Sequence, residues 1–322
     1  MIQEKIESCI LNGLVHIGRL EKKNRNRNRR KRGSMNQIWS DRIQGVMTLY
    51  LSRLLRFDDH FSEQYRKAFQ LDEQKKLKLL EIGCGPGALA ASLHRWYPKA
   101  QITAIDQDSR FISFAKSKVE GVKFIEGDAC QLPFPDNSFD VTISNTVQEH
   151  IDPTAFWGEQ MRVLKPNGIC LCLSARKGIT CLAPCLEMTA SEQDFWERIP
   201  SPQEELKELG IGRYQCSEAE LPQIMEQFGF SDLTTNYVLI DLTPDDSKFP
   251  SQLAETMIEA MRQRDLEAIQ STASGQAEKA IAAVQEKYNE RVRLYQKGIK
   301  QWDTSISLLM IVRGKKPLKA TH

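Results

Sequence analysis

The fold of this chain is decided at residues 79–90, which read LLEIGCGPGALA. The apolar start predicts a buried strand, the three alternating glycines predict a tight loop, and the Ala/Leu-rich end predicts a helix. A strand, a glycine turn and a helix start are the geometry by which a parallel α/β sheet presents a nucleotide site. Glycine permits a positive φ, and the N–H groups of the helix start then face the ligand.

Strand and helix patterns alternate on both sides of this loop. The predicted strands cover residues 78–82, 101–105, 122–126, 139–144 and 169–174, and the helices between them cover 88–97, 109–119 and 154–164. Residues 165–168 (KPNG) predict a plain turn before the fifth strand. Repeated βα units with apolar strands predict a parallel sheet covered by helices on both faces.

The flanking segments do not show the regular alternation of strand and helix. Amphipathic spacing predicts helices over residues 36–56 and 58–69, ahead of the first strand. Residues 176–202 read as irregular, followed by short helices at 204–209 and 218–228, a strand at 233–242, long helices at 250–271 and 276–299, and a strand at 305–312. The expected organisation is an extension (1–34), N-terminal helices (35–76), a cofactor-binding core (77–175), a substrate-side insertion (176–229), two last core strands (230–243 and 303–314) and a helical cap (244–302).

Composition is that of a water-soluble globular protein, with 322 residues, 41% hydrophobic and 27% charged. Apolar runs fall well short of the roughly 18 residues of a membrane span, and acidic Glu4 and Glu7 argue against a secretory signal. We therefore expect a cytoplasmic protein whose eight cysteines are reduced thiols rather than a disulfide framework.

Charge is concentrated in one segment. Residues 22–32 (KKNRNRNRRKR) hold eight of the 44 Lys/Arg, so the rest of the chain has 36 basic against 42 acidic residues. A basic run can bind nucleic acid, but a solvated, disordered tail is the more ordinary interpretation. Because Met35 follows the run and precedes a helical pattern, we expect the functional chain to start there. The acidic remainder makes a nucleic-acid partner unlikely except through residues 22–32.

Two nucleotide ligands compete for the glycine loop. Gly83-x-Gly85-x-x-Ala88 fits a dinucleotide fingerprint, and Asp106 lies where a ribose-binding acid is expected, but S-adenosylmethionine needs the same features. Glu81 favours S-adenosylmethionine, because a carboxylate before the loop opposes a pyrophosphate and suits an ammonium and a sulfonium. Asp128, after the third strand, can accept a hydrogen bond from an exocyclic amine of adenine.

Five ordered motifs resemble the class I S-adenosylmethionine-dependent methyltransferases, and within them the branch of ubiquinone/menaquinone-biosynthesis methyltransferases (type 11). They lie at residues 80–87 (LEIGCGPG), 104–106 (AID), 127–129 (GDA), 139–141 (FDV) and 162–168 (RVLKPNG). The resemblance covers residues 77–175 and implies a Rossmann-like, doubly wound, mostly parallel sheet of seven strands with one antiparallel strand. The last two strands are then 233–242 and 305–312, with a helical insertion between them.

The resemblance also implies the cofactor residues. Glu81, Gly83, Gly85 and Gly87 would surround the methionine part of S-adenosylmethionine. The ribose and adenine would be bound by Asp106, Gln107, Asp128 and Ala129, and Asn145 would lie near the methionine amine. Residues outside 77–175, which form the acceptor site in such enzymes, are not covered, so the acceptor stays open.

His150 is the candidate general base, because it follows the fourth predicted strand at the carboxyl edge where ligands bind. The plainer alternative is a loop histidine that shapes the pocket, and Glu149 either orients it or faces solvent. Cys170 and Cys172 share one face of a strand but lack paired C-x-x-C spacing, so we expect small buried hydrophobes and no metal.

The sequence thus predicts an enzyme that transfers a methyl group from S-adenosylmethionine to a small molecule. Methylation of RNA or protein, a non-catalytic methyltransferase-like binding protein, and an NAD-dependent dehydrogenase are the alternatives. Neither the acceptor atom nor the oligomeric state follows from the sequence.

Overall fold

The computed structural model describes residues 38–199, 210–272 and 277–318. The chain divides into two compact units, each made of three segments. The core unit comprises residues 56–176, 206–240 and 308–322, and the helical unit comprises residues 1–55, 177–205 and 241–307. The expected extension (1–34), Met35 and the expected helix at 204–209 lie outside the described residues.

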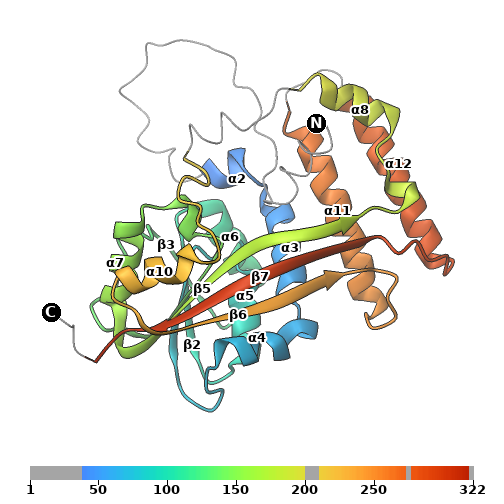
Figure 1. The fold of residues 1–322 in the computed structure, drawn as a ribbon. Helices are drawn as coiled ribbons and strands as arrows, with labels where there is room; N and C mark the ends of the chain where they lie inside the picture. The colour runs from blue at the N-terminus through green and yellow to red at the C-terminus, as the bar shows by residue number, and fades with distance from the viewer. Residues whose placement is uncertain (1–37, 200–209, 273–276, 319–322) are drawn as a thin grey trace, which may run out of the picture. The chain divides into compact units, whose positions relative to one another are not determined.

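A seven-stranded sheet with the order β3-β2-β1-β4-β5-β7-β6 organises the core unit (Figure 1). The strands are β1 (Lys78–Ile82), β2 (Gln101–Asp106), β3 (Lys123–Glu126), β4 (Phe139–Asn145), β5 (Leu164–Cys181), β6 (Ser231–Leu242) and β7 (Thr304–Lys315). Strands β1 to β5 pair in parallel. Strands β5 and β6 begin in the core unit and end in the helical unit, whereas β7 begins in the helical unit and ends in the core unit. Strand β7 is therefore antiparallel to both of its neighbours. The expected mostly parallel, doubly wound sheet is confirmed.

Helices of the core unit begin where the sequence supplies a cap. The side chain of Asp108 accepts the N–H groups of Arg110 and Phe111 at the start of α6, and Asp152 caps α7 in the same way ahead of Pro153. The helices of this unit are η2 (Asp59–Phe61), α4 (Ser62–Phe69), α5 (Ala88–Trp96), α6 (Ser109–Lys118), η3 (Gln148–His150), α7 (Pro153–Val163) and α10 (Glu220–Gln227).

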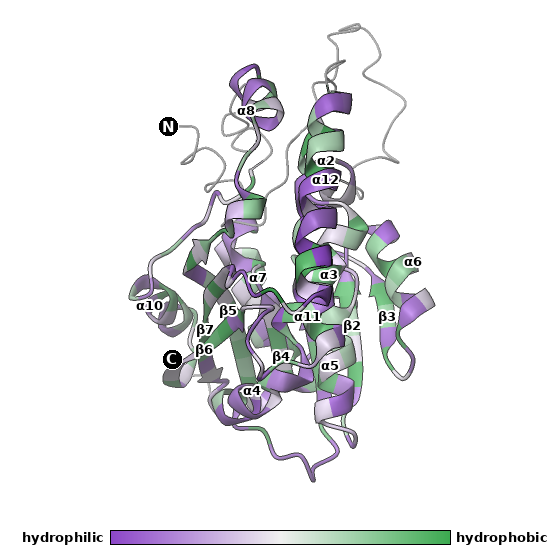
Figure 2. Ribbon diagram, turned by 90° about the vertical axis from the view of Figure 1, so that its right-hand side faces the viewer, coloured by the Kyte–Doolittle hydropathy of each residue, from purple (hydrophilic) through white to green (hydrophobic). Residues whose placement is uncertain are grey.

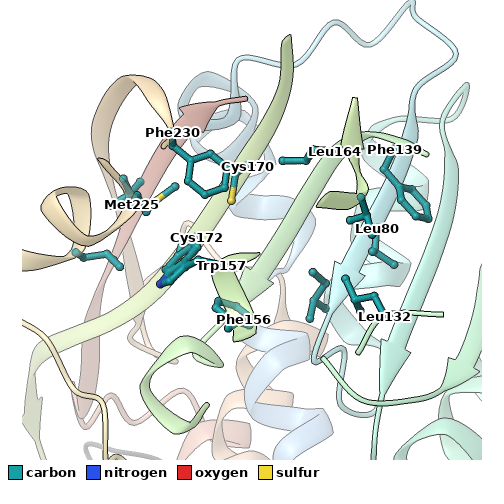
Figure 3. Close-up of a cluster of buried hydrophobic side chains, with 14 of the residues drawn as sticks. Leu80, Leu132, Phe139, Phe156, Trp157, Leu164, Cys170, Cys172, Met225 and Phe230 are labelled. Atoms are coloured by element: carbon teal, nitrogen blue, oxygen red, sulfur yellow. The ribbon is translucent and has the colours of Figure 1, made fainter. Parts of the chain in front are cut away.

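The core of this unit lies between the sheet and helices α7 and α10 (Figure 3). Trp157 contacts Phe230 edge-to-face, with ring centroids 6.0 Å apart. Cys170 and Cys172 are fully buried in the same cluster, which agrees with their interpretation as small hydrophobes. In Figure 2 the strands at the middle of the sheet are coloured hydrophobic, as a sheet buried on both faces requires.

The helical unit is built on an antiparallel helix pair, α11 (Ser251–Gln270) and α12 (Ala277–Gln296). Its own apolar cluster joins α11 and α12 to α8 (Ala190–Glu197) and η4 (Pro184–Leu186). Arg291 of α12 is fully buried between Asp245 and Asp303, at N–O distances of 2.8 and 2.6 Å. None of the helices that the structure describes is both long and apolar enough to cross a membrane.

Three local predictions are wrong, each for a physical reason. The helix expected over 36–56 is two helices, α2 (Ile38–Arg42) and α3 (Val46–Arg56), because the Glu267 carboxylate accepts the Gly45 N–H and caps the second. The turn at 165–168 is present, with Asn167 at a φ of 64°, but it is a bulge inside β5 rather than a turn before it, and its backbone pairs with that of Lys316. The stretch 176–202, expected to be irregular, contains the end of β5 and helices η4 and α8.

Candidate functional site

The glycine loop, residues 83–87, is a left-handed turn between β1 and α5. Gly83, Gly85 and Gly87 have φ values of 69°, 53° and 87°. The conformation is enforced at Gly83, where a Cβ would lie 2.4 Å from Cγ2 of Val147. Both Gly83 and Cys84 donate their N–H groups to the carbonyl of Ile105, at 2.8 and 3.0 Å, which ties the loop to the end of β2. The loop therefore lies at the carboxyl edge of the parallel strands, where open α/β sheets bind ligands.

Glu81 is a buried carboxylate directly before this loop. It is 2% exposed, and its Oε2 atom has no hydrogen-bond partner among the described residues. Burial raises the pKa of the Glu81 carboxyl well above its usual value, and the neighbouring Asp106 carboxylate raises it further. An acid buried in this way without a cation is costly, so the position calls for a positively charged or hydrogen-bond-donating ligand.

Asp106 ends β2 and faces the same loop. Its Oδ2 atom accepts the Gly85 N–H and its Oδ1 atom accepts the Asp108 N–H, both at 2.8 Å. Burial raises the pKa of Asp106 to about 6, although these backbone hydrogen bonds oppose the shift. Each carboxylate oxygen has a second acceptor position, so Asp106 can hold the loop and still accept hydroxyl groups from a ligand.

The end of β4 supplies two more buried polar atoms. Oγ of Ser144 and Oδ1 of Asn145 have no hydrogen-bond partner within the described part of the chain. Thr146, which follows, has a φ of 53°, a left-handed conformation that is unfavourable for a β-branched residue. Strain and unpartnered buried polar atoms beside each other are characteristic of a ligand-binding edge.

The candidate residues for the adenine side lie on two other loops, which follow β2 and β3. Asp128 is exposed and its Oδ1 atom accepts the Cys130 N–H at 2.8 Å, while Gln107 is exposed at the end of β2. Ala129 packs against the main core cluster. The structure therefore gathers Glu81, Asp106 and Asn145 at the strand ends and places Gln107, Asp128 and Ala129 on the loops beyond β2 and β3.

His150 lies at the end of η3, the short helix that follows β4. Its Nδ1 atom accepts the N–H of Gly212 at 2.9 Å, and its Nε2 atom lies 3.9 Å from Oε1 of Glu149. The Glu149 carbonyl accepts the Tyr214 N–H, also at 2.9 Å. His150 is thus placed at the expected edge, but the nitrogen that could accept a substrate proton already accepts a backbone proton.

Sequence reasoning missed the residues that support this edge. Arg162 of α7 donates to the carbonyls of Leu132 and Phe134, and Glu159 accepts the Leu132 N–H at 2.6 Å. These contacts fix the loop that follows Asp128. The arginine was visible in the 162–168 motif, but the Leu132 and Phe134 carbonyls that it binds leave no mark in a sequence.

Within residues 38–199, 210–272 and 277–318, no three His, Cys, Asp or Glu side chains are grouped as metal ligands. Burial also raises the pKa of the Cys170 thiol to about 12, which disfavours the thiolate that a metal would require.

A family comparison covers the part of the chain just described. Residues 80–172, under a third of the chain, match the family profile described as "Methyltransferase domain". Residues 80–172 therefore resemble a methyltransferase domain. This domain contains the glycine loop, Asp106, Asp128, Asn145 and His150.

Two curated relatives are similar to part of the chain. The fatty-acid O-methyltransferase of Mycolicibacterium smegmatis is 39% identical over 113 residues, which are 34% of this chain and 40% of that protein. The demethylmenaquinone methyltransferase of Staphylococcus aureus is 34% identical over 128 residues, 38% of this chain and 53% of that protein. The chain therefore spans about half, or less, of the length of these relatives.

A solved structure shares the fold. Phosphoethanolamine N-methyltransferase 2 of Haemonchus contortus, solved in complex with S-adenosyl-L-methionine, superimposes with a TM-score of 0.50. The alignment covers 88% of this chain and 60% of that chain at 18% sequence identity. The class I methyltransferase fold expected from the sequence is thereby supported.

Proposed function

We propose that this protein transfers a methyl group from S-adenosylmethionine to a small-molecule acceptor. The observation that carries the proposal is the buried Glu81 carboxylate, whose Oε2 atom lacks a partner in the described structure, beside a glycine loop already bound by Asp106. A buried and a half-buried carboxylate next to a backbone cradle form a site for a ligand that is cationic at one end and carries hydroxyl groups.

The donor set fits S-adenosylmethionine better than a dinucleotide. A pyrophosphate beside Glu81 and Asp106 would add negative charge to a site where burial already raises both carboxyl pKa values. An ammonium or sulfonium would lower both and remove the cost of burying the charge. Asn145 Oδ1 adds an acceptor for an ammonium, and the Asp128 loop can accept from an exocyclic amine.

When bound, S-adenosylmethionine supplies an electrophilic methyl group on a sulfonium. The residues of the chain then position the cofactor and exclude water from its methyl group. Glu81 and Asn145 would accept from the ammonium and Asp106 from the ribose hydroxyls. Gln107 would lie beside the adenine, and Asp128 and Ala129 would read the adenine edge. The glycine loop allows close approach of the backbone. Orientation of this kind is the main contribution that a protein makes to an in-line displacement.

A general base is needed only for an acceptor that must lose a proton. His150 is the residue at the strand edge suited to that role, with Glu149 beside Nε2. To act through Nδ1 it would have to release the Gly212 N–H. His150→Ala should lower turnover and leave the Kd for S-adenosylmethionine nearly unchanged, and unchanged turnover would exclude His150 from the reaction.

Small-molecule acceptors are favoured by the two relatives, whose names refer to a fatty acid and to demethylmenaquinone. The net acidic chain outside residues 22–32 disfavours RNA, because phosphate binding needs a basic surface. We also propose a cytoplasmic location, since the buried thiols Cys170 and Cys172 suit a reducing compartment.

The test has a binding arm and a transfer arm. Calorimetric titration should show micromolar binding of S-adenosylmethionine and none of NAD at millimolar concentration. Incubation with tritiated-methyl S-adenosylmethionine and a cell extract, followed by separation into small molecules, RNA and protein, should place the label in the small-molecule fraction.

Each other outcome selects a different function. Label in RNA that disappears when residues 1–34 are removed would establish a nucleic-acid methyltransferase. Cofactor binding with no label in any fraction would indicate a binding protein, and tight NAD binding alone would indicate a dehydrogenase.

A further inference from the structure

The short helix η3 contacts both the glycine loop and a distant segment of the core unit. At its start, Val147 packs so closely on Gly83 that its Cγ2 atom would lie 2.4 Å from a Cβ there. At its end, His150 accepts the Gly212 N–H. Residues 210–216, which we call the 210–216 segment, follow more than 60 positions later in the chain.

Three further contacts hold this segment in the same place. The Tyr214 N–H donates to the carbonyl of Glu149 at 2.9 Å. The Cys216 carbonyl accepts from Nη1 of Arg176 at 2.8 Å, and the Cys216 thiol lies 3.8 Å from Oε1 of the buried Gln148. Among the contacts to η3, only the one made by His150 depends on a side chain that titrates near neutral pH.

We propose that His150 is a positioning residue of the methyl-transfer site: by accepting the Gly212 N–H it holds the 210–216 segment against η3, beside the glycine loop. The inference rests on the proposed function for the identity of the ligand at that loop. The contact itself belongs to the neutral imidazole, in which Nδ1 carries a lone pair and Nε2 carries the proton facing Glu149.

This role differs from general-base catalysis in what can replace the histidine. Asparagine can present its Oδ1 atom close to the position of Nδ1 and accept the same N–H, but it cannot take a proton from an acceptor. His150→Asn should therefore restore what His150→Ala loses if the residue positions the segment. It should be as impaired as His150→Ala if the residue is a base.

The hydrogen-bond model also predicts a dependence on pH. A protonated imidazole donates from both nitrogens, so Nδ1 can no longer accept. Among the described residues, the charged groups near this contact include Glu149 at 3.9 Å and Arg56, which faces Glu149. Arg176 faces Glu218 near the segment, and Arg213, next to Gly212, lies over the Tyr214 ring. Nε2 faces Glu149 in either protonation state, so acidification should break the contact with Gly212 without expelling the ring from its place.

The experiment measures amide hydrogen exchange of the full chain saturated with S-adenosylhomocysteine. At pH 8, His150→Ala should increase exchange at Gly212 and Tyr214 about tenfold, as expected for loss of one hydrogen bond, whereas His150→Asn should not. After correction for intrinsic rates, wild-type protection should fall at pH 5 and that of His150→Asn should persist. His60→Asn, at an exposed histidine on η2, is the matched control.

Turnover with the acceptor found in the labelling experiment completes the test. We expect His150→Ala to lose about tenfold in kcat and His150→Asn to recover most of it. Equal loss in both variants, or unchanged exchange at Gly212 in His150→Ala, would overturn the proposal. The hydrogen-exchange measurement needs no methyl acceptor, so it tests the role of His150 separately from the proposed function. The proposed function would fail if S-adenosylmethionine did not bind.

Discussion

Glu81 is the residue on which the identity of the ligand depends. Glu81→Gln keeps the shape and removes the charge, so the Kd for S-adenosylmethionine should rise about 10- to 100-fold, the usual effect of losing a charge-assisted contact. The melting temperature of the ligand-free protein should stay the same or rise, because a buried carboxylate with one unpartnered oxygen is removed.

Calorimetry and a thermal melt measure the two quantities on the same sample. Glu63→Gln, at an exposed carboxylate on α4, is the matched control and should leave the Kd unchanged. An unaltered Kd in Glu81→Gln would contradict the role of this carboxylate.

Asp106 gives cofactor binding a pH dependence with a defined sign. Its pKa of about 6 in the free protein means that it takes up a proton below that pH. The deprotonated form is the better acceptor for ribose hydroxyls, so the Kd for S-adenosylmethionine should rise as pH falls from 7 to 5. It should approach a tenfold change per pH unit once the pH is well below the pKa.

The same shift acts on stability in the opposite direction. Because the folded pKa lies above that of the unfolded chain, the contribution of Asp106 to the free energy of unfolding is present below about pH 4 and is lost as pH rises through 6. Asp106→Asn should bind weakly at every pH and lack this slope. A wild-type Kd that is flat between pH 5 and 7 would refute the assignment.

At the scale of elements, the glycine loop and η3 must fit each other. Gly83→Ala combines a positive φ with a collision against Val147, so it should cost about 1–3 kcal/mol of stability and weaken cofactor binding. Val147→Ala removes the colliding methyl groups but not the backbone strain. The double variant should therefore recover part of the loss, which a double-mutant cycle of melting curves and binding isotherms measures. Strict additivity would show that the two elements do not touch.

Elements that repeat a local pattern could be predicted, and those set by distant partners could not. The glycine loop and the apolar strands follow from short-range rules, and the structure confirms them. The break before α3 could not be foreseen, because the carboxylate that caps it comes from Glu267, more than 200 residues away.

The same limit applies to β5 and to the candidate site. Residues 165–168 look like a turn, and only pairing with Lys316 near the end of β7 keeps them within the strand. His150 was found from its place after β4, but its partner Gly212 carries no recognisable signal. Nearly every residue has the same backbone N–H group, so the sequence does not indicate which of these groups a side chain binds.

At the scale of the whole molecule, each unit is discontinuous in sequence but has its own core. The core unit packs its cluster on the sheet, whereas the helical unit centres on Ala280, Val284 and Tyr288 of α12. Because every identified cofactor residue belongs to the core unit, we expect binding of S-adenosylmethionine to tolerate local damage to the helical unit.

Arg291 provides the test of that independence. It is fully buried, and its guanidinium binds the buried carboxylates of Asp245 and Asp303. Asp245 also accepts the N–H groups of Gln301 and Trp302, so the cluster joins α12 to the chain on both sides of the helix pair. Arg291→Ala leaves two buried carboxylates without their cation and should cost about 3–5 kcal/mol of stability in the helical unit.

The loss should be local. Hydrogen exchange of Arg291→Ala should accelerate in α11 and α12, while β1 and β4 keep their protection and the Kd for S-adenosylmethionine changes less than about threefold. The triple variant Arg291→Met, Asp245→Asn, Asp303→Asn removes all three charges together and should regain part of the stability, because the penalty arises from unpaired buried charge rather than from lost volume. If protection in β1 and β4 falls together with that in α12, the two units unfold as one, and the acceptor side of the protein cannot be altered without affecting its cofactor site.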